Sequence, residues 1–172
     1  ATLSVTWMKQ SKVLFRSVTS MPVIGIITGV RADGMSFSIN HKSGVSPLKS
    51  VMMCLSNSST FSPIPASVRK LFESDSSSSD LYDLASRTMQ STVMCSPVYL
   101  TLGAPKTGVV ITRTPFESLQ PWEMNPPNTW YVAVTNYDWW TVQPSGDNRL
   151  GLVINNMNQS GRTAGSSEQG LM

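Results

Sequence analysis

The pattern that most limits the folds open to this chain is an alternation of apolar and hydroxyl-bearing residues at its beginning. In residues 2–7 (TLSVTW) every second side chain is apolar, and residues 13–19 continue the period after a polar turn. A period of two predicts β-strands with one face on a core, so residues 3–19 are expected to form a hairpin. The apolar run 23–28 predicts a strand buried on both faces, and 35–40 predicts the strand that follows it. The first forty residues therefore predict an antiparallel meander.

The period changes to that of a helix between residues 65 and 90. Val68 and Phe72 fall on one helical face, after Pro65, a residue suited to a first turn. A serine-rich stretch interrupts the pattern, and Ser79 then suits the N-cap of a second helix whose first turn is acidic. We expect two helices joined by a polar link within one domain.

Strands are predicted again at residues 98–102, 109–113 and 129–135, and a short final helix at 149–157. This order of strands, helices and strands predicts the α+β class with antiparallel sheets, not a βαβ series. A length of 172 residues with 40% apolar residues suits a single domain spanning 1–172. The residues expected to be buried are Leu3, Val5, Ile26, Phe37, Tyr99, Leu100, Val110, Ile111, Tyr131 and Val132.

Composition excludes several partners. Charged residues make up only 13% of the chain, the net charge is +3, and the basic residues are dispersed, so nucleic acid is not an expected partner. The sequence also contains no apolar run of the roughly 18 residues that predict a transmembrane segment. A surface rich in Ser and Thr is typical of a secreted or lumenal protein, and two glycosylation sequons, at Asn57 and Asn158, favour the same compartment.

Few residues could perform catalysis unaided. Cys54 and Cys95 could form one disulfide bridge or remain buried thiols, and neither has metal-ligand spacing. His41 is the single histidine, and a hydrogen-bonded turn histidine is the simplest interpretation of it. We expect no metal site and no cofactor. The residues alone therefore reveal no complete catalytic set.

Three segments resemble a known family. The stretches GVVITRTPFESLQPW, NTWYVAVTNYDWW and GDNRLGLVINNMNQSG are similar to the β-subunit of the acid ceramidase and N-acylethanolamine-hydrolysing acid amidase family. The resemblance implies an αββα sandwich of two antiparallel sheets between helical layers. It also implies a cysteine nucleophile, freed at the start of the β-subunit, whose own α-amine acts as base without a histidine.

By the same resemblance, Asn136 corresponds to an asparagine whose side chain helps to form the oxyanion hole. Arg149 corresponds to an arginine that organises the nucleophile end of the site, and Asn158 falls where the family carries a glycan. The plain alternatives are a strand-end cap for Asn136 and a solvated cation for Arg149. One departure from the family pattern is His41, which stands where the family has a glutamate.

Two hypotheses follow from the resemblance. The first is a lipid-amide hydrolase of lysosomes or the secretory lumen, acting on ceramide or N-acylethanolamine and partnered by an α-subunit or propeptide-derived chain. Under it, residues 1–172 are an incomplete β-subunit-like domain without the nucleophile segment and the closing C-terminal strand. The second is a catalytically inactive paralogue that serves as a binding or structural component of an assembly.

Overall fold

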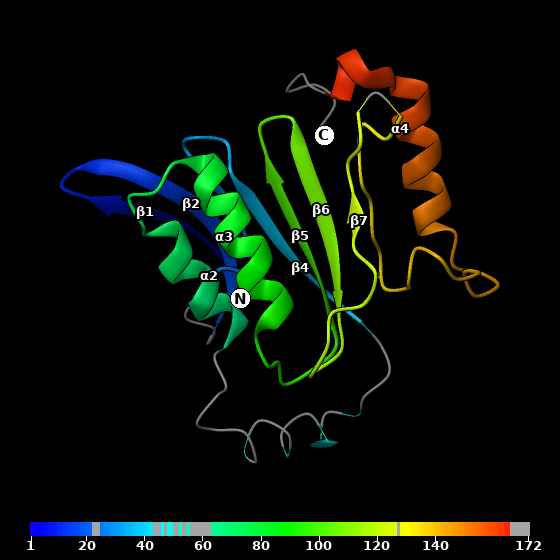
Figure 1. Cartoon of the computed structure of the whole chain (residues 1–172), viewed down its shortest axis with the longest axis horizontal. Coiled ribbons are helices and arrows are strands. Elements are labelled where there is room, and N and C mark those ends of the chain that lie inside the picture. The colour runs from blue at the N-terminus through cyan, green and yellow to red at the C-terminus, as the bar shows by residue number, and fades with distance from the viewer. Residues whose placement is uncertain are drawn as a thin grey trace.

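The computed structural model describes residues 1–21, 25–42, 46, 48–49, 52, 55, 63–126 and 128–165. Its strands form one antiparallel sheet in which each strand pairs with its neighbours in sequence order (Figure 1). The strands are β1 (Thr2–Lys9), β2 (Lys12–Ser20), β3 (Thr28–Arg31), β4 (Ser36–His41), β5 (Val98–Ala104), β6 (Thr107–Arg113) and β7 (Trp122–Glu123). The α+β class with an antiparallel sheet is therefore confirmed.

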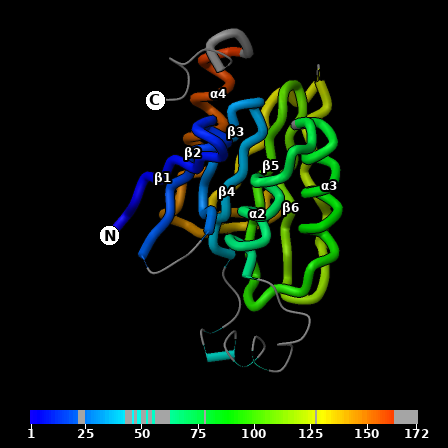
Figure 2. Tube along the Cα trace, turned by 90° about the vertical axis from the view of Figure 1, so that its left-hand side faces the viewer, coloured from blue at the N-terminus to red at the C-terminus, as the bar shows by residue number. Residues whose placement is uncertain are grey.

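Two helices cover one face of the sheet. They are α2 (Ile64–Phe72) and α3 (Ser78–Ser91), and α4 (Arg149–Gly165) lies on the opposite side, beyond β7 (Figure 2). Ser77 caps α3 by accepting a hydrogen bond from the Asp80 amide at 3.3 Å. The N-cap predicted at Ser79 is therefore wrong. Ser77 is the N-cap, because its hydroxyl accepts a hydrogen bond from a backbone amide of the first turn that has no partner within the helix. None of the helices in the described residues is long and apolar enough to cross a membrane.

The core lies between the sheet and the α2–α3 pair. It includes an aromatic stack in which the Phe15 ring packs 5.2 Å from the ring of the partly buried Trp7 and 5.5 Å from the Phe72 ring. Arg69 of α2 covers the Trp7 ring at 4.2 Å, a cation–π contact. Full burial of one such apolar side chain stabilises a fold by roughly 1.5–3 kcal/mol. This packing fixes α2 on β1 and β2.

Two arginines of the sheet bind the C-terminal ends of these helices. Arg31 donates from Nη1 to the carbonyls of Phe72 and Ser74, both at 2.9 Å. Arg113 is fully buried and donates to the carbonyls of Gln90 and Thr92, the latter at 2.7 Å. The last carbonyls of a helix lack partners within the helix and carry partial negative charge. The arginines therefore tie each helix end to a strand.

The predicted core is confirmed for six residues: Ile26, Phe37, Tyr99, Leu100, Val110 and Ile111. Leu3 is 40% exposed, so the prediction that it is buried is wrong. It lies on the edge strand β1, where no described residue covers the apolar side chain of Leu3 completely. Val5, Tyr131 and Val132 are half-buried.

Several predicted boundaries are wrong as well. Residues 129–135 form no strand; Thr129 makes only an isolated bridge with Asn125, because no neighbouring backbone in the described residues supplies a ladder. In the run 23–28, residues 23 and 24 lie outside the described residues and the strand begins only at Thr28. The final helix continues to Gly165 across a kink at Gly161, whose φ is 71°.

Candidate active site

The turn at residues 135–140 lies beside the C-terminal end of β4, and side-chain amides join the two. Asn136 donates from Nδ2 to the His41 carbonyl at 2.8 Å. Asn40 donates in the other direction, from its Nδ2 to the Val134 carbonyl at 3.2 Å. These two hydrogen bonds take the place of a backbone ladder, so residues 134–136 are held against β4 without being a strand.

Asp138 is the second attachment of this turn. Its Oδ1 accepts a hydrogen bond from the Tyr99 hydroxyl at 2.9 Å and also binds Lys42 Nζ. Only 14% of the Lys42 side chain and 19% of the Asp138 side chain are exposed, so this ion pair is largely withdrawn from water. Lys42 also lies 5.2 Å from the centre of the Tyr99 ring. Burial, and then the Asp138 carboxylate, raise the pKa of Tyr99 well above its usual range, so Tyr99 remains a donor at physiological pH.

The third attachment leads to the beginning of α4. Arg149 binds Asp147 through Nε at 2.9 Å, and its backbone amide donates to the same carboxylate at 3.2 Å. These bonds, the Arg149 side chain first, lower the pKa of Asp147 to about 2, and a hydrogen bond with Tyr137 contributes to the shift. Asn136 and Asp138 are thus attached to β4 and to the Lys42–Tyr99 pair, while Asp147 is bound to Arg149 at the start of α4.

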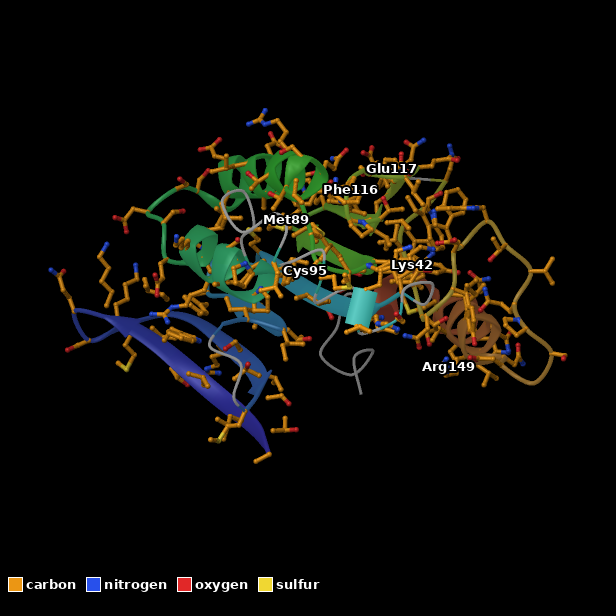
Figure 3. All side chains as sticks on the ribbon, turned by 90° about the horizontal axis from the view of Figure 1, so that it is seen from below. Lys42, Met89, Cys95, Phe116, Glu117 and Arg149 are labelled. Carbon is orange, nitrogen blue, oxygen red and sulfur yellow. The ribbon has the colours of Figure 1, made fainter. Side chains whose placement is uncertain are left out.

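Asn136 and Arg149 share no hydrogen-bond partner in the described residues. Within the described residues the hydrogen bonds that Arg149 donates all go to Asp147, and 57% of its side chain is exposed. In Figure 3, Lys42 and Arg149 lie on the side of the molecule that carries α4, whereas Met89 and Cys95 lie towards α2 and α3. Within the described part of the chain, Asn136 Nδ2 has the one acceptor at His41, and an amide nitrogen carries two hydrogens. It can therefore donate to one further oxygen.

The other candidates have plainer positions. His41 supplies its backbone carbonyl, while the residue itself is exposed. Cys95 is disulfide-bonded, which makes the buried-thiol interpretation wrong for it. Cys54 and the sequon at Asn57 lie outside the described residues. Asn158 is exposed on α4, where its Oδ1 accepts a hydrogen bond from the Tyr131 hydroxyl at 3.0 Å.

Sequence reasoning missed Lys42 and the role of Tyr99. Lys42 was one of several dispersed cations, and Tyr99 was predicted only as a core residue. The available signal was the charge of Lys42, which follows the end of a predicted strand and is opposite to that of Asp138 in the TNYD motif. No three His, Cys, Asp or Glu residues of the described ranges are grouped so as to bind a metal ion.

Three indoles lie next to the turn. The Trp139 ring is 5.4 Å from that of Trp122 and 5.3 Å from that of Trp140. Trp140 is 42% exposed, so the cluster presents an aromatic surface beside the residue that carries the amide. Such a surface suits an apolar ligand group.

Known proteins with similar sequences are amidases. The chain is 28% identical to mouse acid ceramidase over 143 residues, 81% of this chain and 35% of that protein. It is 29% identical to mouse N-acylethanolamine-hydrolyzing acid amidase over 164 residues, 94% of this chain and 44% of that protein. The chain is similar to this family over most of its length. No family model matches it.

A solved structure shows the same fold. The Caenorhabditis elegans N-acylethanolamine-hydrolyzing acid amidase ortholog superposes with a TM-score of 0.75 at 22% identity, covering 97% of this chain and 74% of that one. The fold is therefore the N-terminal-nucleophile hydrolase fold that the sequence resemblance implied. The chain spans less than half of the mouse relatives, at 35% and 44% of their lengths.

Proposed function

We propose that this chain carries the oxyanion-hole part of a lipid-amide hydrolase of the N-terminal cysteine nucleophile class. The observation that carries the proposal is the Asn136 amide, oriented by a hydrogen bond of 2.8 Å to the His41 carbonyl and with one hydrogen left to donate. Similarity to mouse acid ceramidase and mouse N-acylethanolamine-hydrolyzing acid amidase supports the substrate class.

In this mechanism a cysteine thiolate attacks the carbonyl carbon of the amide, and the carbonyl oxygen becomes an oxyanion. Asn136 donates its free N–H to that oxygen. A preorganised donor of this kind stabilises the transition state by on the order of 3–4 kcal/mol. The C–N bond then breaks, the amine leaves with a proton, and water hydrolyses the acyl-enzyme. Since the chain spans less than half of its mouse relatives, we expect the nucleophile from the rest of the protein.

Arg149 is proposed to organise the nucleophile end of the site. Its guanidinium is bound to Asp147, and Tyr137, the neighbour of Asn136, contributes to the lowered pKa of that carboxylate. The acyl chain of the substrate would lie against the indoles of Trp122, Trp139 and Trp140. Ceramide and N-acylethanolamine both present such a chain.

We further propose a lysosomal or secreted location, with an α-subunit or propeptide-derived chain as partner and glycans at Asn158 and Asn57. The disulfide at Cys95 supports an oxidising compartment, because cytosolic proteins rarely keep such bonds. The competing proposal is an inactive paralogue acting as a structural component; His41, in place of the family's glutamate, favours it.

The experiment is amide hydrolysis by the full-length protein, with N-acylethanolamine and ceramide as separate substrates. Turnover of either, lowered roughly 10²–10³-fold by Asn136→Ala at an unchanged melting temperature, supports the hydrolase. Absence of turnover in a folded, correctly processed wild-type protein supports the inactive paralogue.

A further inference from the structure

We propose that Lys42, Tyr99 and Asp138 form a positioning unit that orients the Asn136 amide, so that Asp138 affects amide hydrolysis through Asn136. This inference rests on the proposed function. Asp138 is not a catalytic residue in it, since its carboxylate is bound to Lys42 and Tyr99.

The first step of the argument is a closed ring of contacts between two chain segments. Asn136 binds the carbonyl of His41, and Asp138 binds the side chain of Lys42, the next residue after His41. Two adjacent residues of one segment are thus joined to two nearby residues of the other. A single hydrogen bond leaves one segment free to rotate about it, whereas two attachments fix both separation and orientation.

The second step concerns burial. The Lys42 and Asp138 side chains are only 14% and 19% exposed, so solvent screens their attraction much less than that of a surface pair. Withdrawing such a pair from water is costly, and it does not by itself indicate a contribution to stability. Pairs of this kind are best explained by the geometry that they specify. Here that geometry is the path of residues 136–138.

The third step is the role of Tyr99. It lies on β5, in the centre of the sheet, and its hydroxyl donates to the same Asp138 oxygen at 2.9 Å that Lys42 binds. Tyr99 itself is fully buried. The carboxylate is therefore held by a rigid strand as well as by a flexible lysine, and the turn takes its position from the sheet.

The test is a double-mutant cycle in the full-length protein, combining Asp138→Asn with Asn136→Ala. Asp138→Asn keeps the shape of the side chain and removes its charge. We expect it to lower kcat by roughly 10–100-fold, the scale of a misplaced catalytic group, with KM within about twofold. In the Asn136→Ala background, Asp138→Asn should lower kcat almost no further, because the amide through which Asp138 acts is absent. An undiminished effect there would overturn the proposal.

Two comparisons separate positioning from general destabilisation. Lys42→Arg keeps the charge and should retain most of the turnover that Lys42→Met loses. The matched control is Asp75→Asn, which removes a carboxylate from the exposed pair with Lys9 (3.0 Å) and should leave kcat unchanged. Equal losses in Lys42→Arg and Lys42→Met would count against the positioning unit.

A measurement without catalysis distinguishes failure of this inference from failure of the proposed function. Amide hydrogen exchange should increase at residues 134–138 in Asp138→Asn and stay constant in α3. If the wild-type protein hydrolyses no amide but this pattern is found, the positioning unit stands and the proposed function fails. Unchanged exchange at 134–138 overturns the positioning unit whatever the activity.

Discussion

Asn136 and His41, 95 positions apart in the sequence, are joined by a hydrogen bond of 2.8 Å from the Asn136 amide to the His41 carbonyl. The bond has a direction, because Nδ2 can only donate and the backbone oxygen can only accept. It therefore also fixes which way the amide of Asn136 faces. In the proposed site the same nitrogen would donate to this carbonyl and to the oxyanion, because the amide NH2 carries two hydrogens.

Asn136→Asp is expected to be at least as damaging to turnover as Asn136→Ala. The carboxylate would keep the size of the side chain but would place an oxygen opposite the His41 carbonyl and repel the developing oxyanion. We expect a loss of turnover of roughly 10³-fold or more, beyond that of a missing donor. Single-turnover amide hydrolysis by the full-length protein measures it. Turnover near the wild-type value in this variant would leave Asn136 with only a structural role, its hydrogen bond to the end of β4.

Gly25→Ala should destabilise the protein more than Gly146→Ala, although both glycines have positive φ, +158° and +92°. A Cβ on Gly25 would lie 2.4 Å from the carbonyl carbon of Pro65, whereas a Cβ on Gly146 would meet nothing within 4 Å. We expect about 1 kcal/mol for Gly146→Ala from backbone strain and about 2 kcal/mol more for Gly25→Ala from the clash. Urea unfolding of both variants measures the difference. Equal losses would show that α2 can move away from Gly25.

The sequence predicted elements whose periodicity is decided locally. The hairpin of β1 and β2, the strands β5 and β6, and the α2–α3 pair all follow from alternation or from helical spacing. Prediction from the sequence failed where the pairing of one strand with another decides the structure. Residues 129–135 are an apolar run rich in the aromatic and β-branched residues that favour a strand, but the run and Asn136 after it contact β4 through the Asn40 and Asn136 side chains instead of a ladder. Such a run indicates an extended chain and cannot reveal whether a partner strand lies beside it.

The candidate site shows the same limit. Asn136 and Arg149 were predicted from the family resemblance, because each lies in a continuous segment that carries it. The Lys42–Asp138 contact joins residues 96 positions apart, and a single lysine after a strand gives no sign of its partner. Tyr99 was predicted as core, and it is buried, but its hydroxyl has a polar role that burial alone does not indicate. Polar contacts between residues far apart in the chain could not be predicted from the sequence.

Arg113→Met is expected to lower the free energy of unfolding by roughly 2–5 kcal/mol, the scale of removing one partner from a buried polar network. The change leaves the carbonyls of Gln90 and Thr92 without donors at the end of α3. Arg113→Lys should lose less, because it keeps a cation but cannot reach both carbonyls in the same planar geometry. The control is Arg16→Met at an exposed position of β2, with an expected change within about 0.5 kcal/mol. If Arg113→Met lowered the free energy of unfolding no more than Arg16→Met does, the role of Arg113 in binding the end of α3 would be contradicted.

Asp147 should titrate with a midpoint of about 2 in the folded protein. The usual aspartate value is near 3.9 in an unfolded chain. Because the folded pKa is the lower one, the contribution of this carboxylate to stability is fully present above about pH 4 and is lost as the pH falls towards 2. The contact with Arg149 therefore persists at the moderately acidic pH of a lysosome. Carboxyl-carbon NMR shifts measure the midpoint. Arg149→Gln should return it towards 3.9, and an unshifted wild-type midpoint would contradict the pairing.

Asn158 should carry an N-linked glycan when the protein is made in a secretory host. The residue is exposed on α4, and Tyr131 binds its Oδ1, the amide oxygen, which leaves Nδ2 as the atom to which a glycan is attached. Intact mass should fall on glycosidase treatment of the wild-type protein and fall by less in Asn158→Gln. Asn57→Gln tests the second sequon in the same way, and the double variant should lose the mass shift that these two sites contribute. Tyr131→Phe is the control for the hydrogen bond, since it removes the hydroxyl and leaves the sequon intact, so its glycan should remain. A wild-type mass that glycosidase does not change would contradict the proposed passage through the secretory lumen.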